Sequence, residues 1–279
     1  MLDNQTSRKW VDSPGWFKAF LAATAACLLA YGVNVIWAEL RPGNVWGLTY
    51  GTLATILMVG AAFYAIRRRS VRFFSRMKMG QSHAWVQFHI YGGALFMLLV
   101  FMHTGFNLPS GPLNWWLWAL SLWVTVSGLF GIVLQKWIPR LLNSALAVEV
   151  LYERIPELIK EIQANAATLI ASCAEPVQDL YHNSIARYML EPNVRLIYFV
   201  DITGGIQSRV RQFDFVKRIV STEDKDRLQQ LESMYKTKLQ LDAHYTLQKA
   251  LRWWLVTHVP VSILLLVLVA IHLYAVCVY

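Results

Sequence analysis

Four histidines lie within long apolar stretches of the chain and form two pairs with the same spacing. His89 and His103 are 14 residues apart, and so are His258 and His272. In an α-helix, 14 residues turn to about 40° short of four full turns and rise roughly 21 Å. Each pair therefore lies near one face of a helix. Neutral imidazole is a good iron ligand, and two such helices side by side would place facing histidines at two membrane depths. That arrangement is typical of two stacked bis-histidine haems.

The composition indicates a membrane protein with one soluble portion. Of the 279 residues, 56% are hydrophobic and 15% are charged, whereas a soluble domain carries roughly 25% charged residues. The net charge of +9 does not indicate nucleic-acid binding, because the basic residues cluster beside apolar spans, as the positive-inside rule describes. The three cysteines form neither a CxxCH nor a CxxC motif, which argues against covalent c-type haem and against a thiolate metal site.

Five segments are long enough to cross a hydrocarbon layer of about 30 Å. They cover residues 17–38, 46–66, 84–106, 114–135 and 252–276. Tryptophans gather at several of their ends, as in the aromatic belts of membrane interfaces. The first segment is too long for the apolar core of a signal peptide and lacks a clear cleavage site, so we expect it to be retained.

The charges of the loops predict the orientation of these spans. The loop 67–82 is rich in Arg and Lys and holds no acid, whereas the turns 39–45 and 107–113 hold almost no positive charge. Because cytoplasmic loops carry the excess of positive charge, we expect the N-terminus and the basic loop in the cytoplasm and the C-terminus outside, as in a bacterial inner membrane. The third and fifth spans then run in the same direction.

This parallel direction sets the pairing of the histidines. It places His89 level with His258 and His103 level with His272. Ionisable residues inside a membrane are functional candidates by default. The alternative is that the four histidines are hydrogen-bonded packing residues. Their equal intervals at matching depths favour metal ligation, because the spacing and the charge pattern are independent signals that agree.

We expect three regions along the chain: a tail with four spans over 1–136, a cytoplasmic soluble insertion over 137–250, and a fifth span over 251–279. The insertion is predicted to be mostly helical with a helical hairpin core, and its last helix, 222–250, to run straight into the fifth span. Residues 194–200 (VRLIYFV) read as a short strand followed by a turn at Gly204-Gly205.

Glycines near the histidines are candidate contacts for a haem. A haem is flat and large, so it needs room between helices, which a residue without a side chain provides. Gly92 and Gly105 each follow a histidine of the third span within one turn. Gly47 and Gly60 of the second span are 13 residues apart, close to the histidine interval, so that each could let one porphyrin approach. Glycine-rich faces also mean close helix packing, and both interpretations stay open.

Basic residues at the inner face are candidate partners of the haem propionates. Arg76 and Arg252 could pair with those of the cytoplasmic haem, and ordinary anchoring of the helices explains them equally well. The outer side offers few cations, so the candidates there act by hydrogen bonding alone: Asn107, Asn114, Trp115 and Trp116.

Two segments resemble the haem-binding helices of the cytochrome b family. FHIYGGALFMLLVFMHTGF (88–106) is similar to one such helix, and THVPVSILLLVLVAIHLY (257–274) is similar to its partner, with Pro260 just after the first ligand. The resemblance implies two b-type haems in a four-helix bundle made of spans two to five, with span one as an addition. The Pro-Glu-Trp-Tyr motif of the bc-type complexes is missing. The bundle is also similar to the membrane domains of ferric reductases and NADPH oxidases.

We therefore expect an all-α membrane protein with five transmembrane helices, a di-haem bundle and a mostly helical insertion. The expected function is electron transfer across the bilayer, between the quinone pool and a partner subunit such as a dehydrogenase, an iron-sulfur protein or a c-type cytochrome. A quinone is a further candidate cofactor, and no catalytic residue is assigned. One alternative is a membrane reductase acting directly on ferric iron or oxygen. The other is a non-redox sensor with structural histidines.

Overall fold

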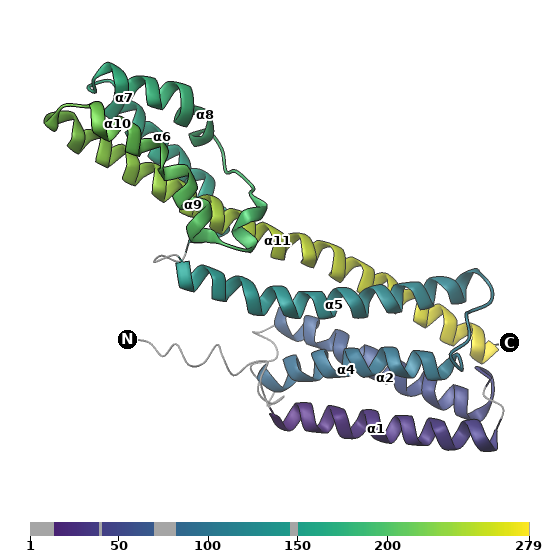
Figure 1. Ribbon diagram of the computed structural model, residues 1–279. Helices are drawn as coiled ribbons and strands as arrows, with labels where there is room; N and C mark the ends of the chain where they lie inside the picture. Colours follow the sequence, from purple (N-terminus) through teal and green to yellow (C-terminus); the bar gives the residue numbers. More distant parts are fainter. Residues whose placement is uncertain (1–13, 39–40, 70–81, 146–149, 279) are drawn as a thin grey trace. The chain divides into compact units, whose positions relative to one another are not determined.

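The computed structural model describes residues 14–38, 41–69, 82–145 and 150–278, which form helices and no strand (Figure 1). The expected all-α class is confirmed for this part of the chain. Arg76 lies outside the described residues, as does most of the basic loop. The long helices are α1 (Pro14–Trp37), α2 (Val45–Arg69), α4 (Ser82–His103), α5 (Pro112–Ala145) and α11 (Thr222–Val278). The shorter ones are α6 (Ile155–Ile170), α7 (Glu175–Leu180), α8 (Ala186–Met189), α9 (Ile202–Val210) and α10 (Gln212–Ile219).

Five of these helices are long and apolar enough to cross a membrane, which confirms the five spans expected from the sequence. They are α1, α2, α4, α5 and the apolar end of α11. Many of their large apolar side chains face outward, as Ile36 and Ile56 do with 80% and 60% of their surface exposed. Such surfaces are covered by lipid in a bilayer, so the chain is that of an integral membrane protein.

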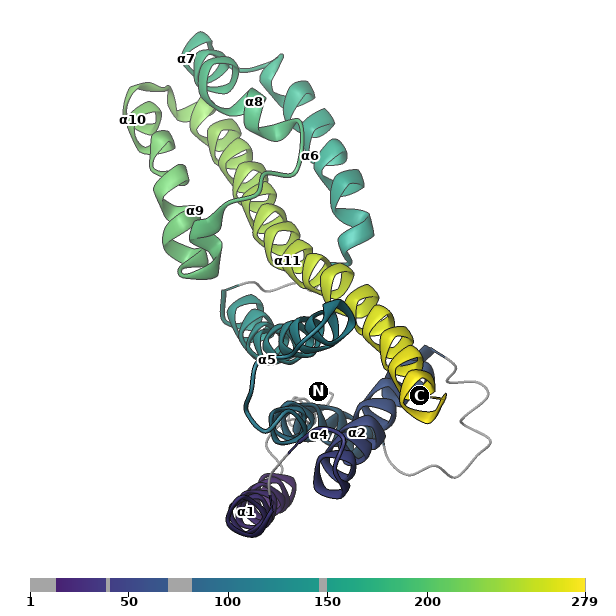
Figure 2. The same ribbon diagram turned by 90° about the vertical axis from the view of Figure 1, so that its right-hand side faces the viewer.

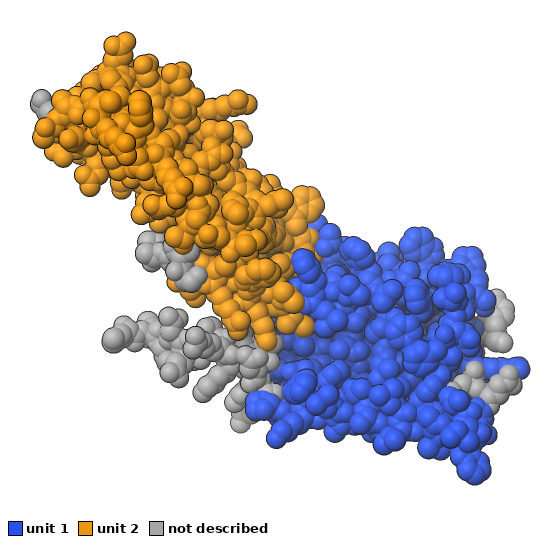
Figure 3. Space-filling view, in the orientation of Figure 1, with its two compact units in different colours: residues 1–130, 256–279 blue, residues 131–255 orange. Residues whose placement is uncertain are grey.

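The chain divides into two compact units (Figure 3). The first comprises residues 1–130 and 256–279, and the second comprises residues 131–255. Helices α5 and α11 contribute to both units. The helix expected over 222–250 does continue into the fifth span, because α11 is one helix of 57 residues, which corresponds to roughly 86 Å.

In the first unit, α4 packs closely along both α2 and α1, whereas α5 and α11 make few close backbone contacts with these helices. The core between them consists of apolar side chains of α2, α4 and α11: Tyr50, Ala54, Met58, Phe96, Leu99, Met102 and Leu265. The buried side chain of Asn34 on α1 donates a hydrogen bond of 2.7 Å to the hydroxyl of Tyr50 on α2. Helix α1, the span additional to the expected four-helix bundle, is therefore hydrogen-bonded to α2.

Helix α4 ends directly after His103 through a glycine cap. Gly105 has a φ of 62°, in the left-handed region that favours glycine. Its N–H donates to the carbonyl of Met102 at 3.1 Å, and the N–H of Phe106 donates to that of Phe101 at 2.8 Å. This is the hydrogen-bond pattern of a Schellman motif. The structure thus gives Gly105 a role in ending the helix at the level of the histidine.

The second unit surrounds the first half of α11 with the short helices α6 to α10 (Figure 2). Its core is formed by fully buried side chains such as Ile185, Tyr198, Phe213, Leu228 and Tyr235. Helices α6 and α11 both contribute to this core, with α7 to α10 between them in the chain. A hairpin of two consecutive helices stays a prediction.

Two local predictions in this unit are wrong. The strand expected over 194–200 is a 3₁₀ turn, η4 (Leu196–Phe199), because the described residues offer no strand to pair with it and Tyr198 turns into the core. The turn expected at Gly204-Gly205 lies inside α9. The carboxylate of Asp201 accepts a hydrogen bond of 2.8 Å from the N–H of Gly204 and so caps the start of that helix.

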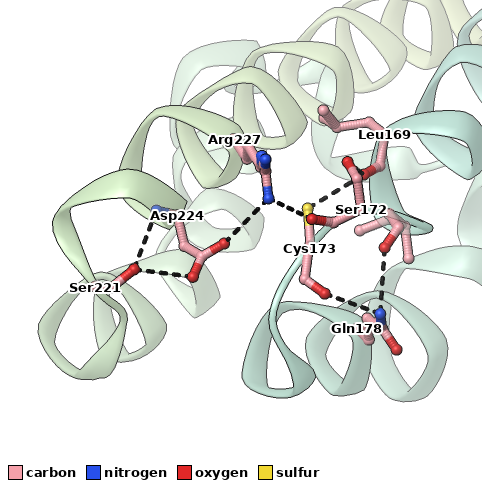
Figure 4. A network of polar contacts seen from close by, with 8 residues as sticks. Leu169, Ser172, Cys173, Gln178, Ser221, Asp224 and Arg227 are labelled. Carbon is pink, nitrogen blue, oxygen red and sulfur yellow. Dashed lines mark hydrogen bonds and ion pairs between the residues drawn. The ribbon is translucent and has the colours of Figure 1, made fainter.

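A polar network holds the start of α11 against the connection between α6 and α7 (Figure 4). The hydroxyl oxygen of Ser221 accepts from the N–H of Asp224 at 3.3 Å and so caps α11, and the hydroxyl donates to the carboxylate of Asp224 at 2.9 Å. Arg227 lies 3.7 Å from Asp224 and also donates to the carbonyl of Ser172. Gln178 donates to the carbonyl of Cys173 at 2.9 Å. The network fixes the helix packing at the end of the unit where α11 begins.

Candidate functional site

The structure brings the four intramembrane histidines together in the two pairs expected from the sequence. The rings of His89 on α4 and His258 on α11 have centroids 6.5 Å apart and planes at 79°. The rings of His103 and His272, on the same two helices, are 6.4 Å apart at 83°. We refer to these as the 89/258 pair and the 103/272 pair.

The separation of the rings fits one metal atom between the two imidazoles of each pair. A metal–nitrogen bond is about 2.0 Å long, and the ring centre lies about 1.1 Å beyond the nitrogen. Two coaxial imidazoles on one metal therefore have centroids about 6.2 Å apart, close to both observed values. In the described part of the chain, no group of three or more His, Cys, Asp or Glu side chains gathers around a common point. Each pair thus fits a metal whose remaining ligands come from a cofactor and not from the protein, as the porphyrin nitrogens of haem iron do.

The rings of both α4 histidines are oriented by backbone carbonyls of α2. Nδ1 of His89 lies 2.9 Å from the carbonyl oxygen of Ala61, and Nδ1 of His103 lies 2.8 Å from that of Gly47. Because a carbonyl only accepts, each Nδ1 must carry the proton. Nε2 then has the lone pair that binds a metal, and the ring is held in that tautomer before ligation.

Ser127 on α5 has the same role toward His258. Its hydroxyl lies 2.9 Å from Nδ1 of His258 and 3.2 Å from the carbonyl oxygen of Val124, to which it can donate. When the hydroxyl donates to Val124, its oxygen accepts from Nδ1–H of His258, and Nε2 is left as the basic nitrogen. The ring of His272 has no such hydrogen bond to another described residue. Three of the four rings are thus fixed by neighbouring helices.

Two glycines adjoin the histidine rings directly. A Cβ at Gly51 on α2 would lie 2.8 Å from Nδ1 of His103. A Cβ at Gly128 on α5 would lie 3.4 Å from Cε1 of His258. Gly51 in particular leaves room for the ring in its observed orientation, since real Cβ contacts are not that short.

The glycines singled out from the sequence have other neighbours. A Cβ at Gly47 would lie 2.2 Å from the carbonyl oxygen of Arg41, so its absence lets the turn before α2 fold close. Gly60 and Gly92 both face the ring of Phe88, at 2.7 Å and 3.7 Å. Gly47 also supplies the carbonyl that holds His103. Contact of these glycines with a porphyrin stays a prediction.

A cavity of about 450 Å³ opens beside the 103/272 pair. Its walls are mostly apolar and come from α2, α4, α5 and α11, including Met58, Phe96, Val100, Leu117 and Val269. Polar side chains at the ends of the helices also line it: Arg41, Asn107, Ser110 and Asn114. An apolar slot with a polar end suits a flat hydrophobic molecule that carries acidic groups at one edge.

Arg41 was not among the residues expected near this site. Asn107 and Asn114 were expected there and line the cavity, whereas Trp115 and Trp116, expected with them, do not line it. The signal for Arg41 was that it is the single cation of the turn 39–45. Of the residues predicted to bind propionates at the other membrane side, Arg252 lies in the second unit. Its guanidinium pairs with Glu153 and stacks 4.1 Å above the ring of Tyr152.

No protein-family model, curated protein or solved structure matches this chain. The function is therefore argued from the geometry of the histidine pairs alone.

Proposed function

We propose that the protein is a di-haem b-type cytochrome that conducts electrons across the membrane, with His89 and His258 as ligands of one haem and His103 and His272 as ligands of the other. The observation that carries the proposal is the geometry of the two pairs. Both have the ring separation of a bis-imidazole metal centre, and three of the four rings have Nδ1 held by a neighbouring helix.

The residues of this chain fit such a cofactor in four respects. They supply two axial nitrogens per centre, hydrogen bonds that set the tautomer, an apolar cavity with a cation at one end, and surrounding lipid that excludes water. When bound, haem supplies reversible one-electron chemistry. The chain holds and orients it and tunes its potential through burial and charge. Arg41 is placed to stabilise an anionic propionate by a charge-assisted hydrogen bond.

The two centres would lie at two membrane depths, because 14 residues of helix separate the ligands on each of α4 and α11, about 21 Å along the axis. This separation supports transfer of electrons from one face toward the other. By the charge pattern of the loops we infer that the 89/258 pair is nearer the cytoplasm, together with the insertion 137–250. The quinone pool and a partner redox subunit are then the proposed donor and acceptor.

A second candidate function is favoured by one specific observation. His272 lines the 450 Å³ cavity and also a neighbouring one of about 410 Å³ with Gly111 and Asn114, and its ring has no hydrogen bond to another described residue. A haem ligated by such a histidine could be reached by a small acceptor. Direct reduction of ferric iron or oxygen at this centre is therefore the alternative to transfer toward a protein partner.

The pyridine haemochrome assay on the purified protein tests the proposal. We expect two b-type haems per chain, one fewer in His258→Ala, and one fewer in His103→Ala, with a different haem lost in each. His182→Ala is the matched control, because this histidine lies in the second unit beside Tyr181, and it should retain both haems. A colourless protein would refute the proposal and leave the non-redox sensor. If ferric chelates or oxygen oxidise the reduced protein rapidly without a partner, the second candidate is favoured.

A further inference from the structure

The second unit exposes a short run of large apolar side chains to its surroundings. Val194, Leu196, Ile197 and Val200 are 51%, 79%, 49% and 74% exposed. We call these four residues the apolar ridge. They follow one another along the chain, whereas scattered exposed apolar residues are ordinary. A contiguous apolar surface of this kind marks a contact with a protein or a membrane.

The ridge is rigidly attached to α11. The N–H of Asn193 donates to the carboxylate of Asp242 at 2.9 Å, and the N–H of Arg195 donates to the hydroxyl of Thr246 at 3.3 Å. Asp242 is itself held by a buried ion pair of 2.8 Å with Lys238. The segment that carries the ridge therefore lies beside residues 242–246 of α11.

This position is close to the point where α11 enters the apolar part of its length. Trp253, which is 62% exposed, lies at the start of the span and seven residues after Thr246, which corresponds to about 10 Å along the helix. The headgroup region of a bilayer is about 5–8 Å thick on each side of the hydrocarbon. Thr246 therefore lies a few ångströms outside the headgroup region. The segment runs toward the span, from Asn193 beside Asp242 to Arg195 beside Thr246, so we expect the residues that follow Arg195 to approach the headgroups.

Basic side chains lie next to the ridge. The guanidinium groups of Arg195 and Arg209 lie 5.6 Å and 4.9 Å from the ring centre of Tyr188. The nearby acid Asp201 is occupied as the cap of α9. Apolar side chains with cations beside them fit the anionic surface of a lipid leaflet.

We propose that the apolar ridge inserts into the headgroup region of the leaflet at which the span of α11 begins. The four side chains are then covered by lipid, and Arg195 lies among the lipid phosphates. The insertion 137–250 would thus be a membrane-associated unit with an attachment beyond those made by α5 and α11. This inference does not depend on the haem assignment, because it rests on the second unit and the course of α11.

Depth-dependent fluorescence quenching tests this contact. The three cysteines are first replaced by alanine, and Leu196→Cys is then labelled with an environment-sensitive fluorophore. The protein is reconstituted in nanodiscs of phosphatidylcholine and phosphatidylglycerol that contain a lipid with a spin label near its headgroup. We expect several-fold stronger quenching at position 196 than at a control position remote from the span.

Phe215 provides that matched control. It is 70% exposed on α10, which is joined to α11 by the 2.6 Å ion pair of Lys217 with Glu232. Glu232 lies 21 residues before Trp253, roughly 30 Å along the helix. Equal quenching of the labels on Phe215→Cys and Leu196→Cys would overturn the proposal and leave the ridge as a surface for a protein partner.

A second pair of variants separates lipid contact from a fault in folding. Val200→Asp should reduce the quenching of a label at position 196, because a carboxylate resists entry among anionic headgroups, while helical circular dichroism stays unchanged. Phe215→Asp should leave that quenching as it is. Unaltered quenching in Val200→Asp, with the fold intact, would count against insertion of the ridge.

Discussion

The hydroxyl oxygen of Ser127 on α5 lies 2.9 Å from Nδ1 of His258 on α11, across 131 residues of sequence. The same hydroxyl can donate its proton to the carbonyl of Val124 within α5, which leaves the oxygen to accept from the imidazole N–H. Ser127 thus orients a histidine ring of α11, as the carbonyls of Ala61 and Gly47 orient the two histidine rings of α4. Helices α2 and α5 thus hold rings that α4 and α11 present, so the orientation of these rings is set before any ligand binds.

Ser127→Ala should weaken cofactor binding at the 89/258 pair and leave the 103/272 pair unaffected. Loss of a hydrogen bond to the distal nitrogen of a metal-binding histidine typically costs about 10–100-fold in affinity. Haem retention during detergent dialysis, followed by optical spectra, measures this loss. Ser262→Ala is the control, because its hydroxyl bonds the backbone carbonyl of His258 at 2.8 Å and not the ring. Equal losses in both variants would argue against a role for the ring hydrogen bond.

Gly51→Ala should displace His103 and remove the haem of the 103/272 pair. The added Cβ would lie 2.8 Å from Nδ1 of His103, which forces the ring to move. Gly93→Ala on α4 is matched to it, since a Cβ there meets nothing within 4 Å, and it should stabilise the helix by about 1 kcal/mol. Haem counts and thermal unfolding of the two variants give the comparison. Two haems retained in Gly51→Ala would mean that the ring can shift without loss of ligation.

The histidine pairs and the five spans could be predicted from the sequence because both depend on local patterns. An apolar run of sufficient length defines a span. A histidine within such a run stands out, because placing an ionisable side chain in the hydrocarbon layer costs free energy. The pairing needed only one further step, the parity of the spans under the positive-inside rule.

The partners of the rings could not be predicted in this way. Ala61 and Gly47 act through backbone carbonyls, which every residue has, and Ser127 resembles any serine on an apolar helix. Their roles depend on the register between helices, which local patterns do not determine. The error at 194–200 has a similar origin, because an apolar run with β-branched and aromatic residues fits a strand and a buried turn alike.

The oxidised protein should have strongly anisotropic low-spin ferric signals in electron paramagnetic resonance. The ring planes are at 79° in the 89/258 pair and 83° in the 103/272 pair. The π orbitals of two perpendicular imidazoles interact equally with the iron dxz and dyz orbitals, which keeps these two orbitals close in energy and enlarges the anisotropy. Low-temperature spectra of the wild type, compared with His103→Ala, assign the signals to the two centres. The ordinary rhombic spectrum of parallel imidazoles would contradict the observed ring angles.

Arg41→Gln should lower the reduction potential of the haem at the 103/272 pair. Arg41 lines the cavity beside this pair, and a nearby positive charge stabilises the reduced state, which has one positive charge fewer. Removing the guanidinium removes that stabilisation, whereas Arg41→Lys should restore most of it. Optical redox titration of the two haems provides the measurement, with the 89/258 haem as an internal control. An unchanged potential would show that the guanidinium does not act on the bound group.

The stability of the second unit should fall as the pH rises from about 10 to about 12, because of its buried tyrosines. Burial, together with the nearby carboxylate of Asp242, raises the pKa of Tyr198 to about 12, from an ordinary value of about 10. Burial raises the pKa of Tyr235 and Tyr181 in the same direction. The folded state therefore keeps protons that the unfolded chain releases. The stabilisation that results from the raised pKa is fully present below about pH 10, and it is lost as the pH rises through the pKa of the folded state.

Tyr198→Phe should flatten this alkaline loss of stability, as measured by urea unfolding followed by circular dichroism at increasing pH. At neutral pH the variant should be at least as stable as the wild type, because the hydroxyl of Tyr198 is buried without a hydrogen-bond partner among the described residues. Tyr188→Phe is the control. The hydrogen bond and charge of Arg209 lower the pKa of this half-buried tyrosine, so its removal cannot flatten the alkaline loss. If Tyr198→Phe unfolds with the same pH dependence as the wild type, the ionisation of this side chain is not coupled to folding.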